Sequence, residues 1–397
     1  MKPNLLLVFC FIGLFLSVPG MDADAQFWKK KNSRPVKKKA APTKPRAETV
    51  KPKKPRVLDY PTSRIKSRYR VDILIPLYLD ELIVDDKPAF KDRLPEKVQS
   101  GYNFYEGIQL AIDTLNALGY NLDVHIHDVS QEKLSPENLI KYKALVGSDL
   151  IIGALSSSQI PPIADYSKKS KINFISAISP ADADVRNNPF FSIMQPTLRT
   201  HCEKMRQEAR KRFPGKITVP VIGRTGSSQD SAALNYVLQG QDKTLSKYFW
   251  YADSILQYLG TYYPGYEFQV FGMPTWRTLN STRKSGSLPS IQVMFSTPFN
   301  YESSSPSAQA VAAHYKKKFY GRPSEMVFRG YETLYWCAYL LQKYGTVFNN
   351  RLGDTGGAAF TPFDLKAQWT ADNDLLYLEN EYAYMYIYQG GSYTIQK

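Results

Sequence analysis

The sequence predicts an α/β fold with open, doubly wound parallel sheets. Residues 149–181 contain an apolar strand, Leu150–Gly153, a serine-rich turn, a short amphipathic helix and a second strand, Ile172–Ala177. Short apolar runs separated by a helical pattern are typical of a βαβ unit. From Val57 onward the chain has about 340 residues, which is long enough for two lobes with separate hydrophobic cores.

The first lobe is predicted from alternating strands and helices. Strand Arg70–Leu77 comes first, and a long loop rich in Asp, Lys and Pro follows it. Residues 102–118 show helical spacing of apolar residues, and Gly119 stands where a helix-terminating glycine belongs. Strand 121–129 and helix 136–146 lead into the βαβ segment, which completes a doubly wound order.

The second lobe is expected to begin after residues 187–189. The predicted elements are strand 190–195, helix 197–212, strand 217–223, helix 247–263 and strand 267–272. Strand 291–295 is expected to return the chain to the first lobe, where the helices 307–320 and 326–344 follow. A Gly/Ser-rich loop is expected over 224–231. Near the C-terminus, aromatic and polar residues alternate at Tyr382, Tyr384, Tyr386 and Tyr388, which indicates a strand or a hairpin edge.

The N-terminus has the features of a secretory signal peptide. Residues 1–25 carry one Lys, an apolar run from Leu5 to Val18, and the sequence Ala23-Asp24-Ala25. The apolar run is too short to span a bilayer comfortably. We therefore expect cleavage after Ala25 and export to the periplasm.

Residues 26–56 form a basic segment rich in Lys and Pro. It contains thirteen Lys or Arg residues and one acid, Glu48, so it accounts for most of the net charge of +15. Such a composition predicts a disordered linker. It is either a solvated spacer or an attachment to an anionic envelope surface. A nucleic-acid partner is not expected, because the segment lacks the aromatic platforms of nucleic-acid modules.

The sequence offers no catalytic motif. A G-x-S-x-G motif, a P-loop, an H-E-x-x-H motif and a dinucleotide glycine fingerprint are all absent. His125 and His127 alternate on one strand, but two such residues more often form a solvated face than a metal site. Cys202 and Cys337 are expected to be buried free thiols. We predict a protein that is not an enzyme and has no metal or cofactor.

Hydroxyl side chains gather where the strands of the βαβ unit end. Ser156, Ser157 and Ser158 follow the first strand, and Ser179 follows the second. In parallel sheets, ligands bind beyond the carboxyl ends of the strands. Hydroxyl groups without a base or thiol suit holding a ligand rather than transforming it. Tyr78, Tyr102 and Trp276 are candidates for stacking on a ligand.

These residues resemble the type I periplasmic binding proteins, close to the receptors for branched-chain amino acids. The resemblance rests on ILIPLY, FYEGIQLAIDTLN, DLIIGALSSS, FISAISPA followed by NNPFF, and FRGYETLYWCAYLL, and covers residues 71–341. It implies two Rossmann-like lobes joined by three crossovers, here near 188–191, 296–299 and 360–363. The first lobe would contain 57–188 and 296–359. The second lobe, 189–295 and 360–397, would be shortened.

The resemblance also implies a ligand site. Ser156 to Ser158 match the loop that takes a ligand's carboxylate, and Pro180 and Ala181 match the next ligand loop. Thr275 and Trp276, which follow strand 267–272, are candidates on the second lobe that come from the residues themselves. However, Ala183 stands where amino-acid receptors have a hydroxyl, and an acid is missing near 272–275. Because a buried ammonium without an anionic partner is costly, free α-amino acids are not expected to bind.

Two functions remain open. The first is a solute receptor that holds a small polar ligand, such as a peptide, sugar or cell-wall fragment, between the lobes and serves a membrane transporter. The second is an envelope scaffold or a regulator of cell-wall machinery that acts through protein contacts. The serine turn favours the receptor, whereas the missing amine anchors, the shortened second lobe and the basic linker favour the scaffold.

Overall fold

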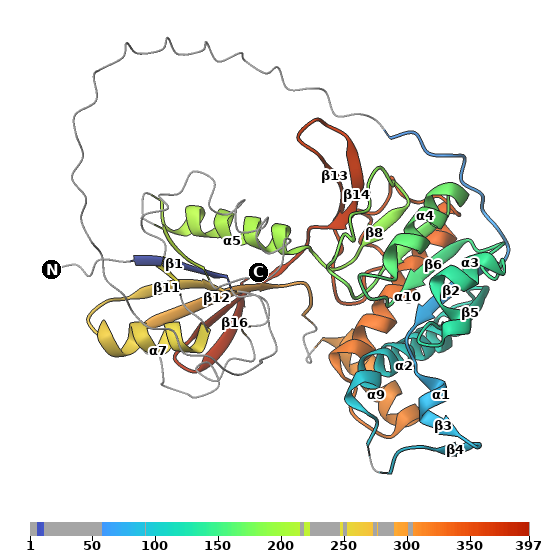
Figure 1. Cartoon of the computed structure of the whole chain (residues 1–397), viewed down its shortest axis with the longest axis horizontal. Coiled ribbons are helices and arrows are strands. Elements are labelled where there is room, and N and C mark those ends of the chain that lie inside the picture. The colour runs from blue at the N-terminus through green and yellow to red at the C-terminus, as the bar shows by residue number, and fades with distance from the viewer. Residues whose placement is uncertain are drawn as a thin grey trace, which may run out of the picture. The chain divides into compact units, whose positions relative to one another are not determined.

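The computed structural model describes residues 6–11, 58–91, 93–214, 218–222, 247–248, 252–272, 276, 290–300 and 305–396. The predicted linker 26–56, the loop 224–231 and Thr275 lie outside these residues. Within them, two large sheets carry most of the strands, with seven strands each (Figure 1). Both sheets are mainly parallel, so the predicted α/β class is confirmed.

The first sheet has the strand order β13-β14-β8-β7-β6-β2-β5. Its strands are β2 (Tyr69–Ile75), β5 (Leu122–Asp128), β6 (Leu150–Gly153), β7 (Asn173–Ser176), β8 (Phe191–Ile193), β13 (Leu365–Trp369) and β14 (Leu375–Asn380). The helices that follow or flank them are α1 (Leu79–Leu82), α2 (Glu96–Ala117), α3 (Pro136–Lys141), α4 (Ile160–Ser170), α9 (Pro306–Phe319) and α10 (Glu325–Tyr344). A 3-10 turn, η1 (Glu132–Leu134), precedes α3. A short hairpin, β3 (Ile83–Val84) and β4 (Lys87–Pro88), lies between α1 and α2.

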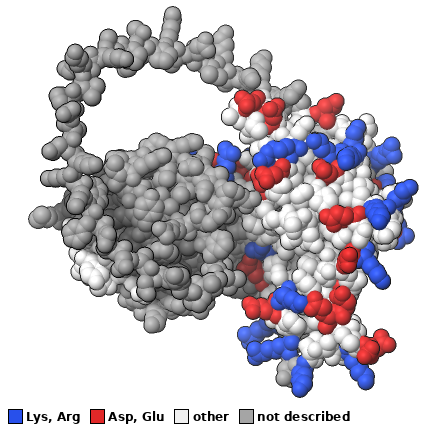
Figure 2. Space-filling model, in the orientation of Figure 1, with Lys and Arg blue, Asp and Glu red and all other residues white. Residues whose placement is uncertain are grey.

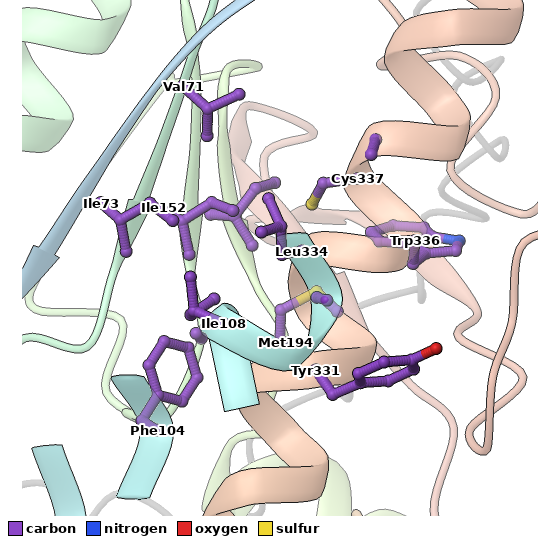
Figure 3. Packing of buried hydrophobic residues seen from close by; sticks show 14 of the residues in the cluster. Val71, Ile73, Phe104, Ile108, Ile152, Met194, Tyr331, Leu334, Trp336 and Cys337 are labelled. Carbon is purple, nitrogen blue, oxygen red and sulfur yellow. The ribbon is translucent and has the colours of Figure 1, made fainter. Parts of the chain in front are cut away.

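Alternation along β2 divides its side chains between two cores. Val71, Ile73 and Ile75 pack with residues of α2 and α10, as the close view in Figure 3 shows for the first two. Leu74 belongs to the other core, with residues of α3 and α4. Because a strand with helices on both faces needs apolar residues in succession, β2 ends in the apolar run Ile73–Ile75, while the buried Asp72 earlier in the strand is paired with Arg70 and His127.

Two glycines allow the helices α2 and α10 to touch along their backbones. A Cβ on Gly107 would lie 2.0 Å from the Val327 carbonyl oxygen, and one on Gly330 would lie 2.1 Å from the Phe104 carbonyl oxygen. Only glycine permits this approach without moving backbone. The two helices thereby form one layer over the first sheet.

The second sheet has the order β10-β9-β1-β11-β12-β15-β16. Its strands are β1 (Leu6–Phe11), β9 (Thr218–Ile222), β10 (Lys247–Tyr248), β11 (Phe268–Gly272), β12 (Ile291–Thr297), β15 (Tyr384–Gln389) and β16 (Ser392–Gln396). Helices α5 (Leu198–Arg212) and α7 (Ala252–Tyr262) accompany it. One core contains Leu256 of α7, and another contains Met205 of α5. These two helices therefore supply residues to two separate cores.

Strand β1 lies within the segment predicted to be a signal peptide. It pairs in parallel with β9 on one side and with β11 on the other. The second sheet thus has as many strands as the first, although its central chain segment is short, because β1 and the hairpin β15–β16 come from the two ends of the chain. Among the described helices, none is long and apolar enough to cross a membrane.

The structure moves the third crossover toward the C-terminus. Strands β13 and β14 belong to the first sheet, where β14 pairs with β8, whereas β15 pairs with β12 in the second sheet. The chain therefore passes between the sheets at residues 381–383 rather than at 360–363. Sequence alone did not show this, because strands β14 and β15 are both rich in apolar and aromatic residues and differ only in the strand that each one pairs with.

Candidate ligand-binding site

The carboxyl ends of β2, β5, β6 and β7 lie at one edge of the first sheet, since these strands are neighbours and parallel (Figure 1). The loops that leave this edge contain Tyr78, Asp128, the serines 156–158 and Ser179. This is the edge at which parallel sheets bind ligands. Most of the predicted first-lobe site residues therefore gather there.

Asp128, the last residue of β5, holds the loop that follows β2. Its carboxylate oxygens accept from the backbone N–H groups of Leu77 at 2.8 Å, Tyr78 at 3.3 Å and Leu79 at 2.9 Å. It also accepts from the N–H of Ser130 at 3.1 Å. Burial raises the pKa of Asp128, but hydrogen bonds from Ser130, Leu79 and Leu77 outweigh burial and hold the pKa below its usual value. The loop is consequently fixed around an ionised carboxylate.

Tyr78 adopts a left-handed backbone conformation at this position, with φ of 55°. Such a conformation is uncommon for a residue other than glycine, and the hydrogen bonds of its N–H to Asp128 and to the Ser130 hydroxyl maintain it. The Lys97 ammonium lies 4.9 Å from the centre of the Tyr78 ring and also forms an ion pair with Glu81. Tyr78 is half-buried, so its ring lines the edge of the sheet.

The three serines 156–158 form an exposed turn between β6 and α4. Gln159 closes the turn: its side-chain oxygen accepts from the Ser156 N–H at 3.2 Å and from the Ser156 hydroxyl at 2.9 Å. The side-chain nitrogen of Gln159 donates to the Val129 carbonyl at 3.1 Å, which joins this loop to the one after β5. The hydroxyls of Ser157 and Ser158 remain exposed at the N-terminal end of α4. The second and third residues of this helix, Pro161 and Pro162, have no backbone N–H, so the serine hydroxyls are the main donors at this end.

The loop after β7 carries the second predicted ligand segment. Ser179 is 9% exposed, and its hydroxyl accepts from the Ala181 N–H at 3.3 Å. Gln195 donates to the Ile178 carbonyl at 2.5 Å and ties this loop to the one after β8. Pro180 is exposed and Ala181 is partly exposed, so backbone rather than side-chain chemistry dominates this part of the edge.

Tyr102 lies on α2, close to the end of β2. A Cβ on the preceding residue, Gly101, would lie 2.2 Å from the Pro76 carbonyl oxygen, which shows how closely α2 packs there. The Tyr102 ring lies 6.4 Å from that of Tyr105, and burial followed by the nearby Glu106 raises its pKa. Tyr102 is therefore part of a cluster on α2 rather than of the serine turn.

Trp276 is placed differently from the prediction. It is 2% exposed and belongs to the core of the second sheet. The Trp276 ring packs directly on Gly272: a Cβ placed on Gly272 would lie 2.2 Å from Cε3 of Trp276. In this structure the indole is occupied by packing, and stacking of Trp276 on a ligand stays a prediction. Thr275 lies outside the described residues.

Each of the two strand histidines is paired with a carboxylate of its own. His127 Nε2 lies 2.8 Å from Asp72 Oδ1, and His125 Nε2 lies 3.3 Å from Asp123 Oδ2. Burial raises the pKa of Asp72, but hydrogen bonds from His127, Arg70 and Ser148 lower it to about 2. In the described part of the chain, no three His, Cys, Asp or Glu residues gather as a metal site.

Sequence reasoning missed the two residues that fix this edge, Asp128 and Gln159. A signal for Asp128 was present, because it is a carboxylate that directly ends a strand of a parallel sheet. Gln159 carried no comparable signal. Its role depends on the Val129 carbonyl, which is far away in the sequence.

Comparison with solved structures identifies the fold. The chain is similar to a putative branched-chain amino acid ABC transporter protein from Rhodospirillum rubrum, with a TM-score of 0.57, 11% identity, and coverage of 83% of this chain and 100% of that one. It is also similar to a branched-chain amino acid ABC transporter periplasmic ligand-binding protein from Burkholderia xenovorans LB400. Here the TM-score is 0.53, the identity is 13%, and the match covers 83% of this chain and 94% of that one. The fold is that of the type I periplasmic binding proteins.

A third solved structure has a similar fold. An amino acid ABC transporter substrate-binding protein from Pseudomonas fluorescens Pf-5 has a TM-score of 0.52, 9% identity, and coverage of 84% of this chain and 96% of that one. No family model and no curated protein matches the sequence. The resemblance to type I periplasmic binding proteins drawn from the sequence is thus confirmed at the level of the fold.

Proposed function

We propose that this protein is an exported, non-catalytic receptor that holds a small polar ligand at the carboxyl edge of the first sheet. The observation that carries the proposal is the serine turn. Ser157 and Ser158 are exposed at the start of α4. Ser156 instead donates hydrogen bonds to the Gln159 side-chain oxygen, which fixes the shape of the turn. Hydroxyls at a helix N-terminus, in a loop that is already fixed, suit a ligand bound by hydrogen bonds.

The ligand is proposed to carry a carboxylate or a similar anionic group. The N-terminal end of α4 has the partial positive charge of a helix dipole, which favours an anion beside the serine hydroxyls. Lys97 on α2 also lies over the Tyr78 ring, but its charge is already paired with Glu81. The preference for an anionic ligand therefore rests on the helix end and the serine hydroxyls.

Free α-amino acids are not proposed as ligands. An ammonium group needs a carboxylate partner, and the oxygens of Asp128 are already engaged by the N–H groups of Leu77, Tyr78 and Leu79. The alanine at position 183 offers no hydroxyl. A ligand without an ammonium group, such as a sugar acid or a cell-wall fragment, fits this edge better.

Export and attachment belong to the same proposal. The signal peptide 1–25 would direct the chain to the periplasm, with cleavage after Ala25. The basic linker 26–56 would then hold the receptor at an anionic envelope surface or beside a membrane transporter. On the face shown in Figure 2, the coloured Lys and Arg are interspersed with Asp and Glu. The attachment is proposed for the linker because of its excess of Lys and Arg.

A second candidate function is an envelope scaffold. It is favoured by the burial of Trp276, which removes one of the two contacts expected from the second sheet. If only the first sheet offers residues to a partner, the fold can serve protein contacts as well as it can enclose a small ligand. The scaffold and the receptor differ in whether a small molecule stabilises the folded protein.

Thermal unfolding of the purified protein against carboxylate-bearing sugars, peptides, amino acids and muropeptides tests the proposal. A ligand present at 100 times its Kd stabilises the folded state by about 2.7 kcal/mol, which raises Tm by a few degrees. Ser157→Trp places a bulky side chain in the exposed turn and should abolish the shift. Ser170→Trp, at the other end of the same helix, is the matched control and should keep it.

Two results would contradict the receptor. One is the absence of any shift across the panel while the protein remains folded, which favours the scaffold. The other is a shift that Ser157→Trp leaves intact, because the ligand would then bind away from the serine turn.

A further inference from the structure

A pocket of about 460 Å³ lies at the edge of the first sheet where the strands begin. One wall is the segment before β2, with Asp59 and Tyr60, and the other is the end of α10 and the loop after it, with Tyr344 and Arg351. The Tyr60 ring lies 5.9 Å from that of Phe190, the residue before β8. The serine turn follows the carboxyl end of β6, so the pocket and the serine turn are separate sites.

Hydrogen bonds join the two walls of the pocket. The Ser63 hydroxyl donates to the Tyr344 carbonyl at 2.6 Å and accepts from the Val347 N–H at 3.0 Å. The Thr346 N–H donates to the Arg64 carbonyl at 3.0 Å. These contacts fix both walls, so little backbone freedom is lost when a ligand binds.

Two exposed, opposite charges line this pocket, those of Asp59 and Arg351, and the other lining residues are uncharged. Among the residues that the structure describes, neither of these two groups forms an ion pair. The Arg351 guanidinium lies 5.7 Å from the centre of the Tyr344 ring, which places it along one wall. The nearby Lys343 ammonium is paired with Asp354 at 2.8 Å. Both charges of the pocket are therefore available to a ligand.

We propose that this pocket binds a small zwitterion, a molecule with both a carboxylate and an ammonium group. Arg351 binds the carboxylate, for which its planar guanidinium offers paired donors, and Asp59 accepts from the ammonium. Tyr60 and Tyr344 contact the apolar part of the molecule. The volume is in the range of small-molecule sites. This site goes beyond the proposed receptor function, because the carboxylate at the other edge, Asp128, is already engaged by backbone N–H groups.

The basic linker is the competing occupant, since it ends close to Leu58 in the sequence. Residues 26–56 carry thirteen Lys or Arg and one acid. The pocket offers this segment one carboxylate, while Arg351 repels it. One charge of each sign therefore favours the zwitterion.

Isothermal titration of the whole chain with phenylalanine, 2-phenylethylamine and 3-phenylpropionate tests the proposal, because each of the last two lacks one charge of the first. We expect phenylalanine to bind most tightly of the three. Arg351→Gln should weaken the binding of phenylalanine and 3-phenylpropionate about tenfold and leave 2-phenylethylamine unchanged. Asp59→Asn should weaken phenylalanine and 2-phenylethylamine by a similar factor and leave 3-phenylpropionate unchanged. The dipeptide alanylphenylalanine, whose charges are farther apart, distinguishes a peptide ligand from a free amino acid.

Arg322→Gln and Asp372→Asn are the matched controls. Both residues are exposed and lie outside the pocket, so these substitutions should leave every affinity unchanged. The proposal is overturned if neither phenylalanine nor the dipeptide binds, or if the ligands with one charge bind as tightly as phenylalanine. It is also overturned if Arg351→Gln and Asp59→Asn bind phenylalanine as the controls do.

The outcomes separate this pocket from the receptor function. Ser157→Trp should bind phenylalanine as the unaltered chain does, and Arg351→Gln should keep the thermal shift caused by a ligand of the serine turn. A shift with an amino acid that Ser157→Trp keeps and Arg351→Gln removes belongs to this pocket and does not bear on the serine turn. Loss of phenylalanine binding in Ser157→Trp would overturn the proposal, because the zwitterion would then lie at the serine turn.

Discussion

The two sheets of this protein have the same number of strands but are assembled in different ways. Five strands of the first sheet, β2, β5, β6, β7 and β8, come from one stretch of chain between residues 69 and 193. The second sheet takes its strands from both chain ends and from the middle, with β1 at residue 6 and β16 at residue 396. Short-range connections build these five strands of the first sheet, and β13 and β14 join it from the C-terminal part of the chain. The second sheet depends on long-range pairing at both chain ends.

The difference also concerns what is buried. Ionised or polar groups lie inside the first sheet and fix its loops, as Asp128 does at the carboxyl edge and Asp72 does with His127. The described core of the second sheet is mostly aromatic and apolar, with Trp276, Phe295 and Tyr388 among its members. A buried carboxylate with several donors specifies one geometry, whereas apolar packing tolerates several. The first sheet is therefore the better support for a defined site.

The largest effect is expected from changing the close contact between α2 and α10. In Gly330→Ala, the new Cβ would meet the Phe104 carbonyl oxygen at 2.1 Å, so two helix backbones must move apart. We expect the free energy of unfolding to fall by about 3 kcal/mol. Chemical denaturation measures it.

Gly353→Ala is the control for this change. Nothing lies within 4 Å of a Cβ built on Gly353, so the unfolding free energy should change by about 0.5 kcal/mol or less. Equal effects of the two substitutions would show that backbone contact between α2 and α10 does not hold the first region together.

Glu332 makes the stability of the first region depend on pH. Its carboxyl group is 2% exposed and accepts from the Thr361 N–H at 3.1 Å. Burial raises its pKa from 4.5 to about 7, against hydrogen bonds from Thr361 and the charge of Arg329, while Glu325 adds to the rise. A raised folded pKa means that stability is full below about pH 4.5 and is lost as pH rises through 7.

The free energy of unfolding should fall by about 3 kcal/mol over this pH range. Glu332→Gln should remove this pH dependence, because glutamine does not titrate. Urea unfolding at pH 5 and pH 8 measures the difference, with the exposed Glu132→Gln as the control. The same pH dependence in Glu332→Gln and in the unaltered chain would show that another group is responsible.

Asp128→Asn is expected to loosen the loop after β2. The substitution replaces one acceptor oxygen by an N–H donor and leaves one backbone N–H, of Leu77 or Leu79, without a good partner. We expect a loss of about 2 kcal/mol in stability and weaker ligand binding, because the loop that carries Tyr78 is no longer fixed. Denaturation and thermal shift with the ligand measure the two effects.

Asp123→Asn, at the other end of the same strand, breaks an exposed ion pair with Arg68. It should cost well under 1 kcal/mol and leave ligand binding unchanged. If Asp128→Asn weakened binding no more than Asp123→Asn, the loop would not be part of the site.

The smallest effect is expected from processing of the N-terminus. A chain that begins at Gln26 lacks β1, yet β9 and β11 are both parallel to β1 and can pair directly. We expect their amides to stay protected from hydrogen exchange in the processed chain. Loss of protection in β9 and β11, with the first sheet unaffected, would mean that residues 6–11 are needed for the fold of the second sheet.

Local patterns predicted the first sheet well. Strand 150–153 has the predicted bounds, and the predicted helix 326–344 differs from α10 by one residue at its start. Apolar periodicity and helix-ending signals within a few residues are enough for such elements. The exposed serine turn was likewise visible, because hydroxyl residues follow a buried strand directly.

Long-range pairing could not be predicted in the same way. Whether Leu375–Asn380 joins the first sheet or the second depends on its pairing with β8, more than 180 residues earlier. The burial of Trp276 depends on the absence of a side chain at Gly272. The predicted helix 247–263 contains a short strand, β10, whose partner β9 lies outside that window.

Hydrogen exchange of the turn after β6 tests the central claim most directly. With a stabilising ligand at saturation, we expect slower exchange at the amides of residues 154–160 and in the loop 76–80, and unchanged exchange in β15 and β16. A ligand that stabilises the protein but slows exchange elsewhere, with residues 154–160 unaffected, would contradict a receptor site at the carboxyl edge of the first sheet.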